Sequence, residues 1–222
     1  MCSIFGYEAF DIPQAQLECE FQKTHHRGPD ATRFVKTGIG YLGFHRLSIM
    51  GLTEAGMQPF SLGQDQVVCN GEVYGFRQIK ERLSQKHEFK SNSDCEIILP
   101  LFQEIGCQMF AKLDSEFAMI IYDGTHQRLI AARDPIGIRP LYYGYTTSHH
   151  IMFSSEPMAL IAFCKKILPF PPGHYYMDGT FVCYSNPSIG GKPIIDSIEK
   201  ITKNIHDKLV KAVEKRLDAD AL

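Results

Sequence analysis

The feature that most restricts the fold is a series of short apolar runs separated by glycine-containing turns over residues 116–184. The runs 117–122 and 128–133, for example, flank the turn Asp123-Gly124. Apolar runs of this length between turn residues are typical of β-hairpins. The same pattern predicts strands at 3–7, 32–37, 40–50, 141–145, 151–154, 174–177 and 181–184. Most of the chain before residue 185 is therefore predicted to be strand-rich.

Helical patterns are fewer and are concentrated between about residues 76 and 113. They predict short helices at 14–24, 76–88, 108–113 and 156–164. A further helix is predicted to begin at Ser93-Asp94-Cys95-Glu96, because this segment fits the S-x-x-E capping box. Pro100 lies about two turns beyond that start and is expected to kink or break the helix. Together these patterns predict an α+β fold of stacked antiparallel sheets.

Residues 66–74 carry the strongest short hairpin signal, which is Asn-Gly between two apolar runs. A two-residue turn is therefore predicted at Asn70-Gly71, with the flanking runs as its two strands. The same turn could also take part in chemistry.

Cys2 is a candidate nucleophile because of its place at the start of the chain. If Met1 is removed, Cys2 carries both a thiol and a free α-amine. An α-amine titrates at about 7.7–8.0, so it can accept the thiol proton directly or through a water. The apolar run Ser3–Tyr7 follows and reads as a buried strand, which would hold the nucleophile in place.

Arg46 stands in the run Gly40–Ile49, which is apolar on both predicted faces of a strand. A buried guanidinium is costly unless it meets an anion. That anion is either an internal carboxylate or the carboxylate of a substrate.

Composition excludes several classes of function. The formal net charge of the 222 residues is −2 and there is no long basic run, so nucleic acid is not expected as a partner. No apolar run approaches the ~18 residues of a membrane span, and the start of the chain lacks the pattern of a signal peptide. The chain is therefore expected to be cytoplasmic.

The seven cysteines are scattered and form no C-x-x-C pair, which argues against a disulfide framework or a zinc site. The adjacent His25 and His26 lack further ligands at suitable spacing. No metal site is therefore predicted, and apart from Cys2 the cysteines are expected to be reduced thiols.

The last part of the chain changes in character. Residues 185–194 read as a linker, and Gly190-Gly191-Lys192 lacks the spacing of a phosphate-binding loop. Apolar residues recur at steps of three and four over residues 195–217, which predicts a long amphipathic helix. Its apolar stripe consists of Ile198, Ile201, Ile205, Leu209, Val213 and Leu217. This stripe needs a partner, either another domain or subunit or a second copy of the chain.

Taken together, seven motifs in order resemble the glutaminase domain of glutamine-hydrolysing asparagine synthetases, which are class II, N-terminal-nucleophile glutamine amidotransferases. The motifs are Met1–Gly6, His26–Asp30, Arg46–Ile49, Asn70–Tyr74, Ser93–Glu96, Ala132–Tyr143 and Phe153–Glu156. The likeness covers residues 2–184. The helix within 195–222 resembles the start of an asparagine synthetase (ATP pyrophosphatase) domain.

This resemblance implies a four-layer αββα sandwich and a reaction. L-Glutamine would be hydrolysed to glutamate and ammonia through a γ-glutamyl thioester on Cys2, supplying nitrogen for asparagine biosynthesis. Asn70 and Gly71 would form the oxyanion hole, and Arg46 would bind the substrate α-carboxylate. Glu72 and Asp94 would hold the α-ammonium group. The main chain of Leu47, Ser48, Ile49 and Met50 would line the pocket, and Arg27 would order the loop.

Three departures from the family pattern matter. Pro100 is unexpected in its helix, and Gly75 replaces an asparagine that usually follows the Glu-x-Tyr segment. The Ser-Gly-Gly-Leu-Asp-Ser pyrophosphate loop of the synthetase domain is missing. We therefore expect a fragment or one subunit of a split enzyme, with no cofactor of its own. ATP and Mg²⁺ would belong to the absent synthetase domain, the expected partner of helix 195–217.

Two other functions remain open at this point. The chain could be an inactive amidotransferase-like module that binds a partner through helix 195–217, or an N-terminal-nucleophile amidase acting on another amide. An enzyme is favoured by the retention of Cys2, Arg46, Asn70, Glu72 and Asp94. The trio Arg46, Glu72 and Asp94 favours an α-amino acid substrate.

Overall fold

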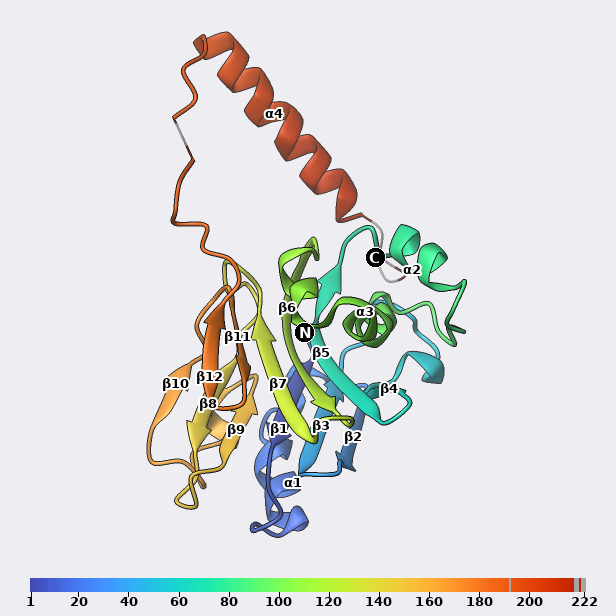
Figure 1. The fold of residues 1–222 in the computed structure, drawn as a ribbon, viewed down its shortest axis with the longest axis vertical. Coiled ribbons are helices and arrows are strands. Elements are labelled where there is room, and N and C mark those ends of the chain that lie inside the picture. Colours follow the sequence, from blue (N-terminus) through green and yellow to red (C-terminus); the bar gives the residue numbers. More distant parts are fainter. Residues whose placement is uncertain (192, 218–219, 221–222) are drawn as a thin grey trace.

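Two six-stranded antiparallel sheets lie face to face in the computed structural model, which describes residues 1–191, 193–217 and 220 (Figure 1). The first sheet has the order β10-β8-β9-β1-β3-β2. Its strands are β1 (Ser3–Tyr7), β2 (Ala31–Lys36), β3 (Tyr41–Arg46), β8 (Tyr142–Tyr145), β9 (Ile151–Ser154) and β10 (Ile167–Pro169). The strand that follows Cys2 is therefore an interior strand.

The second sheet has the order β12-β11-β7-β6-β5-β4. Its strands are β4 (Phe60–Leu62), β5 (Asp65–Val73), β6 (Ser115–Asp123), β7 (Arg128–Arg133), β11 (His174–Met177) and β12 (Thr180–Cys183). Most of these strands fall within or close to the predicted runs. The short strands β4 and β10 were missed.

The core between the sheets is built from the inward-facing residues of both. Ile4 and Phe44 of the first sheet belong to the same buried cluster as Val68 and Ile120 of the second. Each such side chain contributes about 1.5–3 kcal/mol when removed from water. Strands β1 and β3 are buried along their whole length, because helical segments cover their outer face as well.

Helical segments form the two outer layers. Leu17 and Phe21 of α1 (Gln14–Gln22) pack on Phe5 and Tyr7, outside the first sheet. The first sheet is also covered near the short 3₁₀ segment η5 (Pro157–Ala159). The second sheet is covered by α2 (Phe76–Leu83), η3 (Asp94–Ile97), α3 (Ile98–Ile105) and η4 (Gly106–Ala111). The predicted αββα sandwich is therefore confirmed.

The hairpin predicted at Asn70-Gly71 is wrong. Both residues lie inside β5, which runs without a turn from Asp65 to Val73 and pairs along its length with β6. A Cβ atom on Gly71 would lie 2.6 Å from the Glu116 carbonyl oxygen, so glycine is needed for this close strand contact. Long-range pairing has thus overridden the local turn preference.

Two helix predictions and one strand prediction need correction. The helix after Ser93 begins as η3 and becomes α-helical at Ile98, so Pro100 falls in the first turn of α3, where proline is tolerated. The expected break at Pro100 is absent. The predicted helix 156–164 is reduced to η5, and the strand predicted at 40–50 ends at Arg46.

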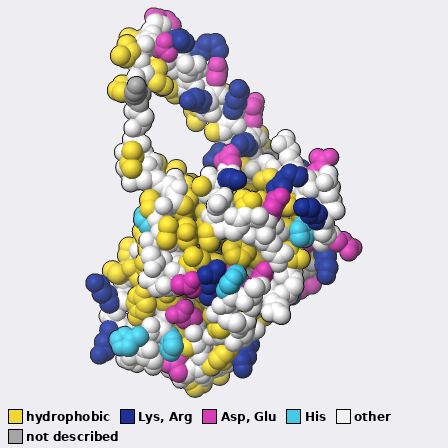
Figure 2. Space-filling view, in the orientation of Figure 1, with side chains coloured by type: hydrophobic (Ala, Val, Ile, Leu, Met, Phe, Trp, Pro, Cys, Tyr) yellow, Lys and Arg dark blue, Asp and Glu magenta, His cyan; other side chains and the backbone are white. Residues whose placement is uncertain are grey.

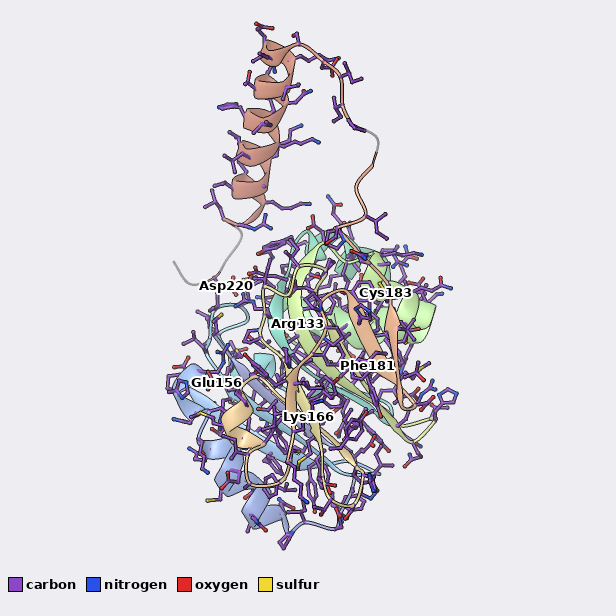
Figure 3. The ribbon with its side chains drawn as sticks, turned by 90° about the vertical axis from the view of Figure 1, so that its left-hand side faces the viewer. Arg133, Glu156, Lys166, Phe181, Cys183 and Asp220 are labelled. Carbon is purple, nitrogen blue, oxygen red and sulfur yellow. The ribbon has the colours of Figure 1, made fainter. Side chains whose placement is uncertain are left out.

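The C-terminal helix α4 (Ile198–Lys215) stands away from the sandwich (Figures 1 and 3). The Ser197 hydroxyl caps its start by accepting a hydrogen bond from the Lys200 amide. Charged side chains line its outer edge (Figure 2), while apolar residues such as Ile205 and Leu209 remain exposed. None of the described helices is long and apolar enough to cross a membrane.

The end of α4 and the described residues that follow it contact the domain. Lys215 forms an ion pair with Asp114, and the Arg216 guanidinium stacks on the ring of Tyr74. Asp220, labelled in Figure 3, accepts a hydrogen bond from the Gly51 amide at 2.8 Å.

Candidate active site

The pairing of β1 with β3 places Cys2 beside the residues that follow Arg46. Ser3 is directly opposite His45, so residue 2 comes level with Arg46 and Leu47. The Leu47 amide donates to the Cys2 Sγ atom at 3.3 Å, and the thiol lies 3.5 Å from the Leu47 carbonyl oxygen. The thiol therefore has both a hydrogen-bond donor and an acceptor from one residue.

The backbone of Cys2 is fixed from the other side by Arg27. The Arg27 Nε atom donates to the Cys2 carbonyl oxygen at 3.1 Å, and the same guanidinium forms a 3.2 Å ion pair with Glu156. The next residue, Gly28, lies so close to β3 that a Cβ atom would be 2.3 Å from the His45 carbonyl oxygen. The His-Arg-Gly-Pro-Asp segment thus clamps the ends of β1 and β3.

A small pocket of about 40 Å³ opens at Cys2, between the two sheets' edges. All the predicted site residues except Ser48 line it; these are Cys2, Arg46, Leu47, Ile49, Met50, Asn70, Gly71, Glu72 and Asp94. The Ser48 amide instead donates to an Asp30 carboxylate oxygen at 2.7 Å, outside the pocket lining. Segments far apart in the sequence are therefore brought to one place.

Asn70 and Gly71 present hydrogen-bond donors to this pocket. The Asn70 Nδ2 atom is buried and has no hydrogen-bond partner in the part of the chain that the structure describes. The amides of Cys69 and Val73 donate to the Gln58 and Asp94 side chains. Because alternate amides of a strand point to the same side, the Gly71 amide lies between those two and faces the pocket.

Arg46 is buried at the rim of the pocket without an acidic partner among the described residues. Its two terminal nitrogens donate to the carbonyl oxygens of Thr53 at 2.9 Å and Gly51 at 2.5 Å. A Cβ atom on Gly56 would lie 2.7 Å from the guanidinium, so the loop packs tightly around it. The positive charge is oriented by main-chain dipoles and remains available to an anion.

Glu72 and Asp94 supply negative charge at the same pocket. Asp94 is 4% exposed and accepts the Val73 amide at 2.7 Å. Burial raises the pKa of the Asp94 carboxyl group, although hydrogen bonds from Val73 and Cys95 oppose this shift. Glu72 lies directly opposite Glu116 in the β5–β6 ladder. The pocket is therefore lined by both basic and acidic groups.

Burial also raises the pKa of the Cys2 thiol, while the Leu47 amide, the amino terminus and Arg139 act in the opposite direction. Burial lowers the pKa of the amino group of Met1, and the Arg27 and Arg139 charges lower it further. Arg139 is a pocket residue to which sequence reasoning gave no role. Its motif was noted, but no spacing signal shows that this loop returns to Cys2.

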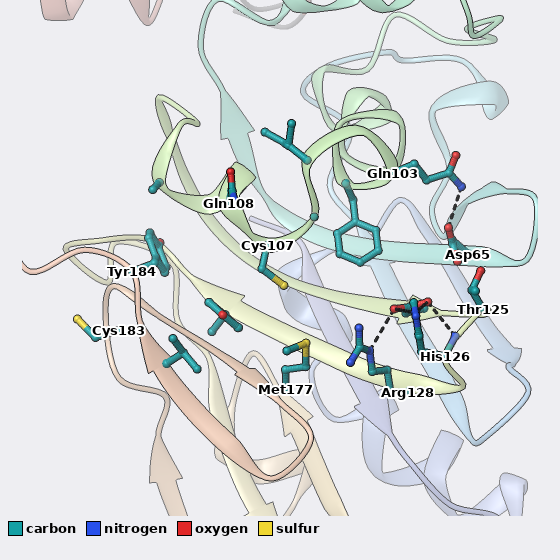
Figure 4. Close-up of a pocket in the computed structure, with 17 residues that line it drawn as sticks. Asp65, Gln103, Cys107, Gln108, Thr125, His126, Arg128, Met177, Cys183 and Tyr184 are labelled. Carbon is teal, nitrogen blue, oxygen red and sulfur yellow. Dashed lines mark hydrogen bonds and ion pairs between the residues drawn. The ribbon is translucent and has the colours of Figure 1, made fainter.

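A larger cavity of about 790 Å³ lies elsewhere, on the outer face of the second sheet (Figure 4). Its carboxylates are engaged by neighbours. Asp65 accepts from Gln103 at 2.7 Å, and Asp123 is paired with His126 and Arg128. The described residues contain no group of three or more His, Cys, Asp or Glu side chains suited to a metal ion.

Comparison with known proteins agrees with the geometry of the Cys2 pocket. A family model described as "Glutamine amidotransferase domain" matches residues 1–176, which include every residue of that pocket. The chain belongs to the glutamine amidotransferase family. In this amidotransferase, the nucleophile candidate and its surroundings all lie within the matched region.

Similar proteins include probable glutamine-hydrolyzing asparagine synthetases. The one from Dictyostelium discoideum is 38% identical over 209 residues, covering 89% of this chain and 37% of that protein. One from Acanthamoeba polyphaga mimivirus is 34% identical over 254 residues, covering 99% of this chain and 46% of the relative. This amidotransferase therefore spans less than half the length of these relatives.

The fold is shared with solved amidotransferase structures. A glutamine phosphoribosylpyrophosphate amidotransferase from B. subtilis superposes with a TM-score of 0.67 at 21% identity, covering 78% of this chain and 46% of that one. An allosteric regulatory enzyme of purine biosynthesis gives a TM-score of 0.68 at the same identity and coverage. At this identity the likeness concerns the fold.

Proposed function

We propose that this chain hydrolyses the side-chain amide of L-glutamine to glutamate and ammonia through a γ-glutamyl thioester on Cys2. The observation that carries the proposal is the convergence of the Cys2 thiol, the Asn70 amide and the Arg46 guanidinium on one pocket. Membership in the glutamine amidotransferase family supports the choice of substrate.

The reaction starts within Cys2 after Met1 has been excised. The free α-amine accepts the thiol proton, and the thiolate attacks the amide carbon of the substrate. A C–S bond forms and the carbonyl oxygen takes the negative charge. The ammonium then gives its proton to the leaving nitrogen, the C–N bond breaks and ammonia departs. Water hydrolyses the thioester and restores the thiol.

The charge on the oxygen needs donors that are already in place. The Asn70 Nδ2 atom is buried without a partner among the described residues, so it can donate without breaking another bond. The Gly71 amide would be the second donor. Preorganised donors of this kind contribute most of their effect in the transition state, where the charge develops.

The two ends of the amino acid group have matching charges. Arg46 would bind the α-carboxylate, and guanidinium suits a two-pronged contact with a carboxylate. Glu72 and Asp94 would hold the α-ammonium, and the main chain of Leu47 to Met50 would form the wall.

With Met1 in place, the pocket of about 40 Å³ has room for only a few water molecules, because one water molecule needs about 10–15 Å³. Met1 lines the pocket beside Cys2. Removing Met1 therefore enlarges the pocket and exposes the amine in the same step.

The direct test is a glutaminase assay on the full chain with Met1 removed, following both glutamate and ammonia. Cys2→Ala should abolish turnover with the fold unchanged. Cys183→Ala is the matched control, because Cys183 is an exposed free thiol far from the pocket. Retention of even a tenth of the activity in Cys2→Ala would contradict the proposal.

We further propose that the ammonia serves asparagine synthesis by a synthetase domain or subunit that binds α4. Two observations support this: the relatives named above are probable asparagine synthetases, and α4 exposes Ile198, Ile205, Leu209 and Val213. Burial of each apolar side chain contributes about 1.5–3 kcal/mol, which favours association.

The test supplies the chain with glutamine, aspartate, ATP and Mg²⁺. We expect glutamate and ammonia but no asparagine, because the sequence carries no pyrophosphate-binding loop. Asparagine formed by this chain alone would contradict the proposal that a separate synthetase domain or subunit carries out asparagine synthesis. Light scattering of the same sample measures whether copies associate, and Leu209→Lys should weaken any association through α4.

A further inference from the structure

Arg139 reaches the Cys2 pocket from a loop rather than from a strand. It follows β7 by several residues, yet it lines the pocket together with Met1 and Cys2. The side chain is buried, and its Nε atom has no hydrogen-bond partner among the residues that the structure describes. Buried polar groups without a hydrogen-bond partner are few in folded proteins, so this unused donor calls for an explanation.

The loop that carries Arg139 is held rigidly. The carboxylate of Asp134 accepts the amides of Ile138 at 2.9 Å and Arg139 at 3.0 Å. Arg133 donates to the carbonyl oxygens of Arg139 at 2.7 Å and Gly137 at 2.8 Å. The side chains of Arg133 and Asp134 together therefore fix the position of the Arg139 backbone.

The charge of Arg139 is paired with one carboxylate. One terminal nitrogen forms a 2.8 Å ion pair with Glu116. The charged and titratable groups that act on the amino group of Met1 are Cys2, Arg27, Arg139 and Asp30. Those that act on the Cys2 thiol are the amino terminus, Cys69 and Arg139. Of the two arginines, Arg27 acts on the amino group of Met1, whereas Arg139 acts on both that amino group and the Cys2 thiol.

We propose that Arg139 is a positioning residue for the Cys2 reaction, whose fixed positive charge keeps the Cys2 amine unprotonated and favours the thiolate. This inference rests on the proposed function. A nearby cation disfavours the ammonium form of the amine and favours the anionic form of the thiol. The effect on the thiol favours release of its proton, and the effect on the amine keeps that group in the neutral form that can accept a proton. The ammonium so formed is also a stronger acid toward the leaving nitrogen.

The first experiment compares Arg139→Met, Arg139→Lys and wild type by the pH dependence of kcat/KM for glutamine. In Arg139→Met the acid limb should move to higher pH, so that the ratio of kcat/KM at pH 6 to that at pH 8 falls about threefold or more. Arg139→Lys keeps the charge and should restore most of the profile. Arg128→Met, in the distant cavity of Figure 4, is the matched control and should behave as wild type.

Glu116→Gln tests the sign of the effect. Removing the counter-ion leaves the charge of Arg139 less neutralised, so the acid limb should move to lower pH. An unshifted profile in Arg139→Met, an equal shift in Arg139→Lys, or a Glu116→Gln shift in the same direction as Arg139→Met would each overturn the inference.

A second readout separates this inference from the proposed function. Alkylation of Cys2 by iodoacetamide, followed by mass spectrometry of its peptide, reports thiolate formation without turnover. Arg139→Met should slow alkylation at pH 7 about threefold or more. If the chain lacks glutaminase activity but this change occurs, the proposed function fails and the role of Arg139 stands. If turnover occurs and alkylation is unchanged, the role of Arg139 fails alone.

Discussion

Arg27 holds Cys2 by its main chain: the Arg27 Nε atom donates to the Cys2 carbonyl oxygen at 3.1 Å. The contact leaves the thiol free to face the pocket, while the ion pair between Arg27 and Glu156 ties the clamp to the segment after β9. Cys2 is thus held through its main chain by a residue that does not line the pocket.

Excision of Met1 should decide whether the protein is active. A sample with Met1 retained should show no glutaminase activity, because the amine is displaced from the thiol and Met1 lines the pocket beside Cys2. Intact mass spectrometry of separated species, each assayed for ammonia release, checks this. Full activity in the Met1-retained species would remove the proposed proton route.

Arg46→Ala should lower kcat/KM for glutamine by about a hundredfold or more, since loss of a buried charge-assisted contact costs about 2–5 kcal/mol. Arg46 also donates to Thr53 and Gly51, so thermal unfolding must be measured in parallel. The control is Arg33→Ala, which removes an exposed ion pair with Glu54.

Glutaramide provides a further arm of the same experiment. This amide lacks the α-carboxylate, so Arg46→Ala should change its hydrolysis far less than that of glutamine. Equal losses for both substrates would mean that Arg46 supports the loop rather than the substrate.

Asn70→Ala should lower kcat by about 10²–10³-fold with a smaller effect on KM, because the donor acts mainly on the charge of the transition state. Stopped assays of glutamate at saturating glutamine measure this. Asn186→Ala, in the linker, is the control. A variant that loses affinity but keeps kcat would place the Asn70 amide in ground-state binding.

His45 should make the fold sensitive to acid. Burial lowers the pKa of His45 from 6.5 to about 4, so the folded protein excludes a proton that the unfolded chain binds. This contribution to stability is fully present above pH 6.5 and is lost as pH falls toward 4. Between pH 7 and 4.5 the loss is about 2 kcal/mol.

Urea unfolding at the two pH values measures this effect. His45→Gln should lose less stability on acidification than wild type, even if it is less stable at pH 7. The His206 side chain is 75% exposed on α4, so His206→Gln should lose as much stability on acidification as wild type does. Identical acid sensitivity in His45→Gln and wild type would contradict the assignment.

The sheets could be predicted because apolar runs and turn residues are local signals. The prediction failed where long-range pairing decided the outcome. Asn70-Gly71 has the composition of a turn, but β6 extends alongside it and keeps β5 straight. Pro100 was misread for a different reason: the helix register starts at Ile98, and the sequence does not show that the preceding residues form a 3₁₀ segment.

The pocket was predicted from motifs, and the structure brings most of those residues to one place. The motifs could not show which distant loops fold back to the pocket. Arg139 depends on the course of the turn fixed by Asp134, and the Ser48 amide turns to Asp30 rather than to the pocket. Neither relationship has a periodicity that can be read along the chain.

Because β1 is an interior strand, the order of chain synthesis affects when Met1 can be removed. β1 pairs with β3 on one side and with β9 on the other, and residues 151–154 of β9 leave the ribosome long after residue 1. During that interval the first peptide bond is part of an open segment that an aminopeptidase can grip. In the closed sandwich Met1 remains 48% exposed beside Cys2, so a chain that folds untrimmed is expected to behave as an inactive precursor that can still be processed.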